Sequence, residues 1–323
     1  MSEQRAGGID VSKAWLDVAA RPGRPVARFA NTTAGHAEVV AHLAALPVEE
    51  RPAVLVVAAT GGLERGIDRA LTAVGWTVVV VNPRPVRDCA RCLGRLAKTD
   101  RLDAEVLARY GETLDPEPRP RPEARLQELR DLEARRRQLV EMLTMEKNRL
   151  QQAPPRTQAG IRRHLEFLRE ELADVTRQLA DAIQADPTWR ETVARLRTVA
   201  GIGPIPATLL VLDLPELGRL DRKALAALVG VAPCNRDSGA ARGTRSCTGG
   251  RAAVRTGLYM AVRSAIRGNP AIRACYTRLT AAGKRDKVAV VACIRTLLAS
   301  LNVMLRTKTD WDPQRVQPTT TPA

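Results

Sequence analysis

Two uninterrupted apolar runs in the first third of the chain constrain its fold most. They are AVLVVAA at residues 53–59 and the valines of WTVVVVNP at residues 76–83. A strand that is apolar at every position is typical of a sheet covered by helices on both faces. Helical patterns precede, separate and follow the two runs, and the second of the following helices begins near Thr99. This part of the chain therefore predicts an α/β domain.

Three shorter strand-like segments come before these runs, with the sequences AGGIDVS, WLDVAAR and PVARFAN. Three strands in a meander, followed by alternating helix and strand, is the order of an RNase H-like domain. Other α/β folds share parts of this order. We assign the predicted α/β domain to residues 1–114.

The rest of the chain has a helical pattern. The proline-rich segment DPEPRPRPEAR at residues 115–125 predicts a linker. Leucines then recur at heptad spacing on both sides of a break at QQAPPRT, which predicts a coiled-coil helical hairpin within residues 115–186. The hairpin allows two interpretations. It is either an antiparallel pair within one chain or a dimerisation arm that also contacts RNA. In the second case, replacing Leu139 and Leu172 by lysine should give monomers. Residues 187–310 predict a mostly α-helical domain, and residues 311–323 a flexible tail.

The charge of the chain points to a polyanionic partner. Lys and Arg number 51 against 35 Asp and Glu, so the formal net charge is +16. Arginine pairs with phosphate through a planar fork, and nucleic acid is the usual partner of so basic a chain. A coding bias towards arginine is the alternative. The start of the chain lacks a signal-peptide pattern, and no apolar run reaches the roughly 18–20 residues of a membrane span. Of the six cysteines, Cys89 and Cys92 form one CxxC, but no second pair stands at zinc spacing, which fits reduced thiols in a reducing compartment. We expect a cytoplasmic, nucleoid-associated protein without a membrane partner.

Three acidic residues form the first candidate site. Asp10 ends the first predicted strand, and Asp100 and Asp103 share one face of a later helix by their spacing. An acid on the first strand plus a carboxylate pair on a helix is how RNase H-type nucleases hold Mg²⁺ for phosphoryl transfer. The alternative is that Asp100 caps its helix and Asp103 pairs with Arg101 or another neighbour. We predict that the three acids bind metal and act in catalysis.

Ser238, in the segment CNRDSGAARGTR, is a candidate nucleophile, although Asp-Ser-Gly is most often only a turn. The three histidines lie far away in sequence, which argues against a Ser-His-Asp triad. Neighbouring arginines suit a phosphate in the transition state. Two glycines form a turn that resembles a helix-hairpin-helix, and two further basic pairs suit phosphate backbones, with a solvated surface as the alternative. The predicted nucleic-acid-binding residues are Gly201, Gly203, Arg236, Arg242, Arg245, Arg251, Arg255, Lys284 and Lys287.

Several segments together carry a family resemblance. They include GIDVSKAWLDV, AATGGLERG, GRLAKTDRLDA, VAGIGP, ALVGVAPCNRDSG and AGKRDKVAVVACIR, in order over nearly the whole chain. The set resembles the bridge-RNA-guided recombinases of bacterial insertion sequences. The resemblance implies a RuvC-like domain with a DEDD set of acids, a coiled coil, and a transposase domain with a nucleophilic serine. Asp10 matches the first acid, Asp100 and Asp103 match the last two, and Ser238 matches the serine that becomes linked to a DNA phosphate.

The same resemblance implies partners, and one position departs from it. The partners are a non-coding bridge RNA, donor and target DNA, Mg²⁺, and further copies of the chain in dimers and dimers of dimers. Within these, a serine of one subunit completes the acid site of another. Ala58 stands where the family has its second acid, and a methyl group cannot bind metal. Glu64 follows closely, but we do not assume that it substitutes. The predicted function is RNA-guided DNA recombination through a phosphoserine intermediate. The alternatives are an RNase H-fold nuclease or junction resolvase that uses water, and a catalytically dead RNA- and DNA-binding protein.

Overall fold

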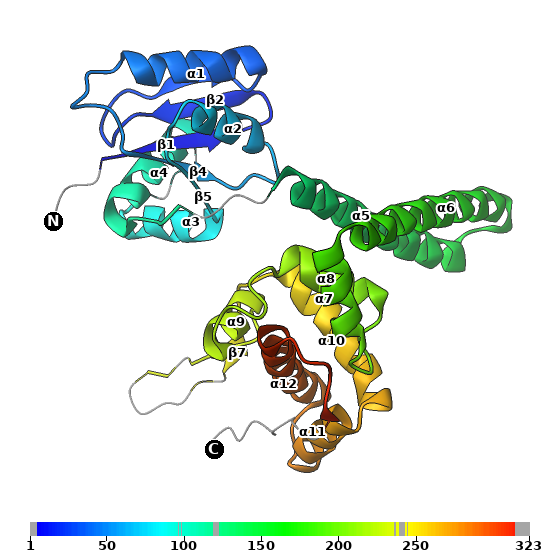
Figure 1. Ribbon diagram of the computed structural model, residues 1–323. Coiled ribbons are helices and arrows are strands. Elements are labelled where there is room, and N and C mark those ends of the chain that lie inside the picture. Colours follow the sequence, from blue (N-terminus) through cyan, green and yellow to red (C-terminus); the bar gives the residue numbers. More distant parts are fainter. Residues whose placement is uncertain are drawn as a thin grey trace. The chain divides into compact units, whose positions relative to one another are not determined.

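The chain forms two compact units, Met1–Arg121 and Pro122–Ala323. The computed structural model describes residues 5–95, 97, 99–118, 123–235, 237–238, 243 and 245–313. The first unit is a mixed α/β domain and the second is mostly helical (Figure 1). This division agrees with the predicted fold class at the level of secondary structure. The helices at residues 124–185 belong to the second unit together with the helices that follow them.

The first unit contains a five-stranded sheet with the order β3-β2-β1-β4-β5. β1, β2 and β3 form an antiparallel meander, and β4 and β5 run parallel to β1. Every residue of β4 is buried, as its apolar run predicted. β5 lies at the edge of the sheet, so Val80 is exposed despite the similar sequence of that run. The strands are β1 (Ala6–Val11), β2 (Trp15–Ala19), β3 (Ala27–Ala30), β4 (Val54–Ala58) and β5 (Val78–Val81).

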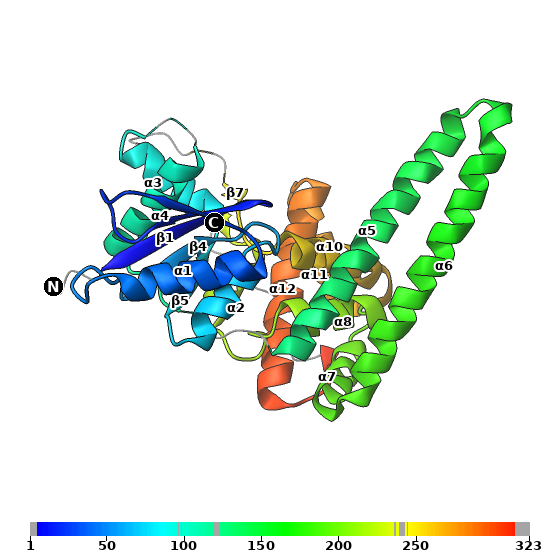
Figure 2. The same cartoon turned by 90° about the horizontal axis from the view of Figure 1, so that it is seen from above.

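Helices cover both faces of the sheet, as Figures 1 and 2 show. One face packs against α1 (Thr33–Ala45) and α2 (Arg65–Ala73). The other packs against α3 (Pro83–Cys92) and α4 (Asp100–Leu114). Because successive strand residues point to opposite faces, Ile9 faces α1 and α2 while its neighbour Asp10 faces the α3 and α4 side.

A glycine in β1 brings α4 close to the sheet. A Cβ atom at Gly8 would lie 2.1 Å from the carbonyl oxygen of Ala104 and 2.4 Å from the amide nitrogen of Ala108. Any side chain at this position would therefore push the helix away. The contact places the start of α4 beside the end of β1, which is where the predicted acids lie.

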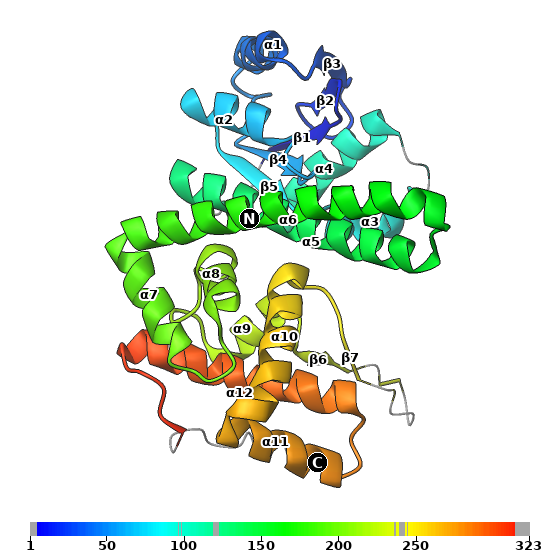
Figure 3. The ribbon, with the colours of Figure 1, turned by 90° about the vertical axis from the view of Figure 1, so that its right-hand side faces the viewer.

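The second unit begins with a hairpin of two long helices. α5 (Ala124–Gln152) and α6 (Pro155–Ala185) pack side by side along their apolar residues (Figure 3). Leu139 and Leu168 are buried in this seam within a single chain. The heptads therefore form an intramolecular pair. Leu139 is fully buried in its own chain and Leu172 is partly buried, so lysine at these positions would disturb this pair as well. That the hairpin also joins protomers stays a prediction.

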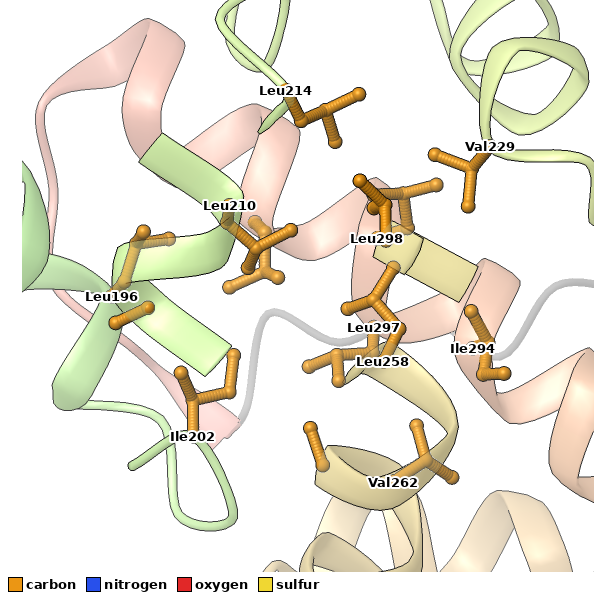
Figure 4. Close-up of a cluster of buried hydrophobic side chains, with 14 of the residues drawn as sticks. Leu196, Ile202, Leu210, Leu214, Val229, Leu258, Val262, Ile294, Leu297 and Leu298 are labelled. Atoms are coloured by element: carbon orange, nitrogen blue, oxygen red, sulfur yellow. The ribbon is translucent and has the colours of Figure 1, made fainter. Parts of the chain in front are cut away.

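The remaining helices form a bundle around one hydrophobic core. Figure 4 shows Leu196, Leu210, Leu258 and Leu297 meeting in it from four different helices. The hairpin is fixed to this bundle, since Arg130 Nε donates to the carbonyl oxygen of Leu212 at 2.8 Å. The helices are α7 (Pro187–Arg197), α8 (Pro204–Asp213), α9 (Arg222–Val229), α10 (Ala252–Gly268), α11 (Pro270–Ala281) and α12 (Asp286–Thr307).

Two details at the C-terminal end differ from expectation. α12 is long and apolar enough to cross a membrane by length and composition, although no such run was expected. It packs as a core helix, with Ile294, Leu297 and Leu301 fully buried. The predicted tail starts in contact with the bundle, since the Trp311 amide donates to Thr198 Oγ1 at 3.0 Å. The end of that tail, residues 314–323, lies outside the described residues.

Candidate active site

The three predicted acids line one cavity in the first unit. Asp10 comes from the end of β1, and Asp100 and Asp103 come from the first turn of α4. The cavity has a volume of about 750 Å³, and Ala58 also lines it. Residues that are 90 positions apart in sequence are therefore brought together at the carboxyl ends of two neighbouring parallel strands, where sites in open α/β sheets commonly form.

Local structure fixes the two helical acids. Thr99 caps α4, and its Oγ1 accepts a hydrogen bond from the Leu102 amide at 3.4 Å. Asp100 is therefore the first residue of the helix and does not cap it. Asp103 lies one turn further along the same face, immediately before the Ala104 that contacts Gly8. The alternative in which Asp100 serves as the cap is wrong, because Thr99 already has that role.

Negative charge is concentrated around Asp10. Burial, and after it the nearby carboxylates of Asp103, Asp100 and Asp17 in that order, raise the pKa of its carboxyl group to about 6. The protonated form is favoured because the ionised carboxylate is poorly solvated and lies near other negative charges. A bound cation would relieve this repulsion, so the electrostatics of the cavity favour a metal ion.

Two arginines partly balance the helical acids. Arg28 Nη2 lies 3.3 Å from Asp100 Oδ2, and Arg87 Nη1 lies 3.4 Å from Asp103 Oδ1. Asp103 thus has a basic neighbour, as one alternative expected, but from α3 and not from Arg101. Both pairs are partly exposed, and such pairs stabilise weakly. A cation could therefore displace them at little cost.

Asp17 and Arg28 were missed by sequence reasoning. Asp17 pairs with Asp10 across β1 and β2, and Arg28 pairs with Asp17 across β2 and β3. Asp17 is only 1% exposed and accepts two hydrogen bonds from Arg28, at 3.0 and 2.8 Å. The Arg28 guanidinium also lies 5.9 Å from the ring centre of Trp15. The available signal was a charged residue inside the otherwise apolar strand WLDVA.

The donor set fits a hard divalent cation, because carboxylate oxygens are the ligands that Mg²⁺ prefers. In the described parts of the chain, no three His, Cys, Asp or Glu side chains already converge on one point in metal-binding geometry. The three acids line the same cavity without enclosing an ion.

Ala58 and Glu64 have different places relative to this cavity. Ala58 ends β4 and is 7% exposed, and its methyl group lines the cavity. Glu64 Oε2 accepts hydrogen bonds from the amides of Thr60 at 3.0 Å and Gly62 at 2.9 Å, and from Thr60 Oγ1. Burial raises the pKa of Glu64, but these hydrogen bonds outweigh it and lower the pKa overall. Glu64 closes the loop after β4, and it is not among the residues that line the cavity.

Ser238 lies in the second unit, away in sequence from the acids. It is exposed, between the short paired strands β6 (Pro233–Cys234) and β7 (Ser246–Cys247). Arg245, one of the three arginines predicted to flank it, is also exposed. The other two, Arg236 and Arg242, lie outside the described residues. An exposed hydroxyl is accessible to a large substrate such as DNA.

The side chains of Arg251 and Arg255 bind other groups of the second unit. Arg251 forms two hydrogen bonds with the Glu216 carboxylate, at 2.5 and 2.6 Å, and one with the carbonyl oxygen of Asp213. Arg255 donates to the carbonyl oxygen of Gly249 at 2.7 Å. Their spacing predicted a basic stripe for phosphate. The structure instead gives their guanidinium groups partners within the protein.

The other predicted nucleic-acid contacts divide in two. Gly201 has a φ of +105°, and a Cβ there would lie 2.5 Å from that of Ala265, so tight packing accounts for this glycine. Gly203 caps α8 and has open space around it. Lys284 and Lys287 are exposed at the start of α12. The last three remain accessible to phosphate.

Comparison with known proteins places this architecture among enzymes that rearrange DNA. Residues 7–154 match the DEDD family model for IS110, described as a transposase, and residues 193–277 match the model described as transposase IS116/IS110/IS902 family. The chain is 26% identical over 315 residues to the pilin gene-inverting protein of Moraxella bovis, covering 94% of this chain and 97% of that protein. It is 27% identical over 293 residues to the pilin gene-inverting protein of Moraxella lacunata, covering 88% and 89%.

The fold and these matches define a DNA transposase or recombinase. Within that class, the chain belongs to the IS110 family of transposases.

Proposed function

We propose that this transposase is an RNA-guided recombinase that cuts and rejoins donor and target DNA through a phosphoserine intermediate. The observation that carries the proposal is that Asp10, Asp100 and Asp103 line one cavity. The strand order β3-β2-β1-β4-β5, antiparallel in the meander and parallel beyond it, supports a RuvC-like domain of the RNase H type. The exposed Ser238 in the separate second unit supports the proposed phosphoserine intermediate.

The acids have the first role in this reaction. Asp10, Asp100 and Asp103 would hold Mg²⁺, which when bound stabilises the negative charge that develops on the phosphate and the leaving oxygen. Arg28 and Arg87 keep the helical acids near the cavity until then. Gly8 keeps α4 close enough for those acids to meet Asp10.

Ser238 has the second role. Its Oγ forms a bond to the phosphorus of the scissile phosphodiester, and the bond from phosphorus to one deoxyribose oxygen breaks. The serine loses its proton, and the leaving oxygen gains one. A deoxyribose hydroxyl of the other strand then attacks the phosphoserine, which restores a phosphodiester and returns a proton to Ser238. The bond energy of the phosphodiester is conserved, so no nucleotide cofactor is needed for rejoining.

The expected partners follow from the charge and the division into two units. A net charge of +16 suits both DNA and a structured bridge RNA encoded by the element. Because the serine and the acids belong to different units, a dimer or a dimer of dimers can join them between protomers. Such a protein would act on the DNA of the nucleoid in the cytoplasm.

The test is a search for the covalent intermediate. Purified protein, with the RNA encoded beside its gene, is mixed with end-labelled donor and target DNA in Mg²⁺ and resolved on a denaturing gel. We expect a protease-sensitive adduct of one DNA end with the protein, and none with Ser238→Ala. If Ser238→Ala still cuts the DNA, water is the nucleophile and the protein is a nuclease or junction resolvase of the same fold. Omitting the RNA tests whether it guides cleavage. Adducts at the same DNA sites without the RNA would contradict RNA guidance.

A further inference from the structure

A second pocket lies on the C-terminal unit, in a part that the proposed chemistry does not use. It opens between α10 and α11, which pack together in Figure 3. Its volume is about 440 Å³, within the range of small-ligand sites. We call it the two-tyrosine pocket, and it is lined by Tyr259, Met260, Arg263, Ile266, Arg267 and Tyr276.

One carboxylate holds two of the polar groups of this pocket in place. Asp286 Oδ1, at the start of α12, accepts a hydrogen bond from the Tyr276 hydroxyl at 2.6 Å and another from Arg263 Nη1 at 3.0 Å. The ring and the guanidinium group are therefore oriented before any ligand arrives. Such fixed geometry reduces the entropy lost on binding.

The pocket combines apolar surface with positive charge. Met260 is 63% exposed, so its flexible apolar side chain is available to a ligand. The residues that line the pocket include two arginines and no carboxylate. Lys284, Arg285 and Lys287 flank Asp286 and are all exposed. The ligand that fits must therefore present a flat or apolar group together with negative charge.

We propose that the two-tyrosine pocket binds one unpaired nucleotide of a nucleic-acid strand. The base packs against the tyrosine rings and Met260, because every base has a π-face that stacks on aromatic side chains. The adjoining phosphates contact Arg263, Arg267 and the cations at the start of α12. This inference rests on the proposed function only in that the protein binds unpaired RNA or DNA strands. It goes further by assigning the pocket in which an unpaired base binds.

The experiment uses photocrosslinking with short single strands that contain 5-iodouracil, which forms adducts with tyrosine and other residues that stack on it. The protein is the full chain with Ser238→Ala and without Mg²⁺, so no strand chemistry takes place. We expect mass spectrometry to find adducts on Tyr259, Met260 or Tyr276. RNA and DNA strands are tested separately, and the strand type that crosslinks more strongly identifies the source of the nucleotide.

Binding measurements with matched variants complete the test. Tyr276→Ala should weaken binding of the preferred strand about tenfold. Tyr276→Phe should weaken it less, because the ring remains while its hydrogen bond to Asp286 is lost. Met260→Ala should also weaken binding, whereas Met145→Ala should not. Met145 is the matched control because it is 50% exposed on the hairpin, outside the pocket.

Two results would overturn the assignment. One is crosslinking that maps only to residues outside the pocket. The other is that Tyr276→Ala, Tyr276→Phe and the parent protein all bind the preferred strand with equal affinity. Failure of the phosphoserine proposal gives a different result, since the covalent adduct at Ser238 would be missing while the crosslinks in this pocket persist.

Discussion

A carboxylate introduced at position 58 should turn a weak metal site into a strong one. Ala58 ends β4 beside Asp10, and its methyl group lines the cavity that also holds Asp100 and Asp103. In Ala58→Glu, the new side chain would extend into this cavity. In Ala58→Gln, a side chain of nearly the same size would do so without charge, which makes it the matched control.

The magnitude follows from the charges already present. A carboxylate about 6 Å from Asp10, at an effective dielectric constant of about 20, adds a repulsion of about 3 kcal/mol. The open cavity screens part of this, so about half, or roughly 1.5 kcal/mol, is expected in metal-free buffer. That corresponds to a Tm lower by about 5 °C for a unit of this size. With Mg²⁺ the sign reverses, and each tenfold gain in affinity adds about 1.4 kcal/mol of stability at saturating metal.

The assay is thermal unfolding of the parent, Ala58→Glu and Ala58→Gln proteins across a Mg²⁺ titration, together with strand exchange between donor and target plasmids. We expect Ala58→Glu to be the least stable without metal, to gain most from Mg²⁺, and to exchange strands at least tenfold faster than the parent. Ala58→Gln should resemble the parent in its response to Mg²⁺. If both variants respond to Mg²⁺ alike and neither changes exchange, the metal is held elsewhere and our assignment of the cavity is wrong.

Three further predictions concern single residues. The pKa of Asp10, about 6 against an ordinary value of 3.8, makes the folded state bind a proton more tightly than the unfolded state. Its contribution to stability is therefore full below pH 4 and is lost as the pH rises to 6. Asp10→Asn should abolish this loss when the free energy of unfolding is measured by chemical denaturation without metal. A pH profile of stability that is the same in Asp10→Asn and the parent would contradict the prediction. Arg28→Ala leaves the buried Asp17 carboxylate without its partner and should lower the free energy of unfolding by about 3 kcal/mol. Arg28→Lys should lower it less, because a positive charge remains. Equal losses in the two variants would show that the ion pair of Arg28 with Asp17 does not stabilise the fold. Leu139→Lys should lower the helical signal in circular dichroism by unfolding the hairpin, because Leu139 is fully buried within one chain. A variant that is fully folded but monomeric would instead favour the interpretation of the hairpin as a dimerisation arm.

The mixed α/β class of the first unit could be predicted because its signals are local. Strand burial follows from apolar runs such as residues 53–59, and helix starts follow from caps such as Thr99. The contact of α4 with β1 could not be predicted in the same way. Gly8 is one of two adjacent glycines, and only the tertiary structure shows that a helix backbone occupies the space beside it.

Side chains that one segment places together could be recognised in the sequence, whereas a contact shared by two strands could not. Asp100 and Asp103 stand on one helix face, so their spacing was informative. The pair of Asp17 and Arg28 depends on strand register, which sequence does not reveal. Arg251 and Arg255 show the opposite error. Their spacing predicted an exposed basic stripe, but Glu216 and backbone carbonyl groups bind their side chains.

The separation of serine and acids into two units leads to a last prediction. Asp10→Ala removes an acid and Ser238→Ala removes the nucleophile, so each protein alone should be inactive. If the serine of one protomer serves the acids of another, a mixed dimer contains one complete site, formed from the serine of the first protein and the acids of the second. In an equal mixture, half of the dimers are mixed and each has one complete site of two, so about a quarter of the parent activity should return. Mixing Asp10→Ala with Asp100→Ala is the control, since both lack acids and no complete site can form. If the first mixture stays as inactive as this control while dimers are shown to exchange subunits, serine and acids act within one protomer.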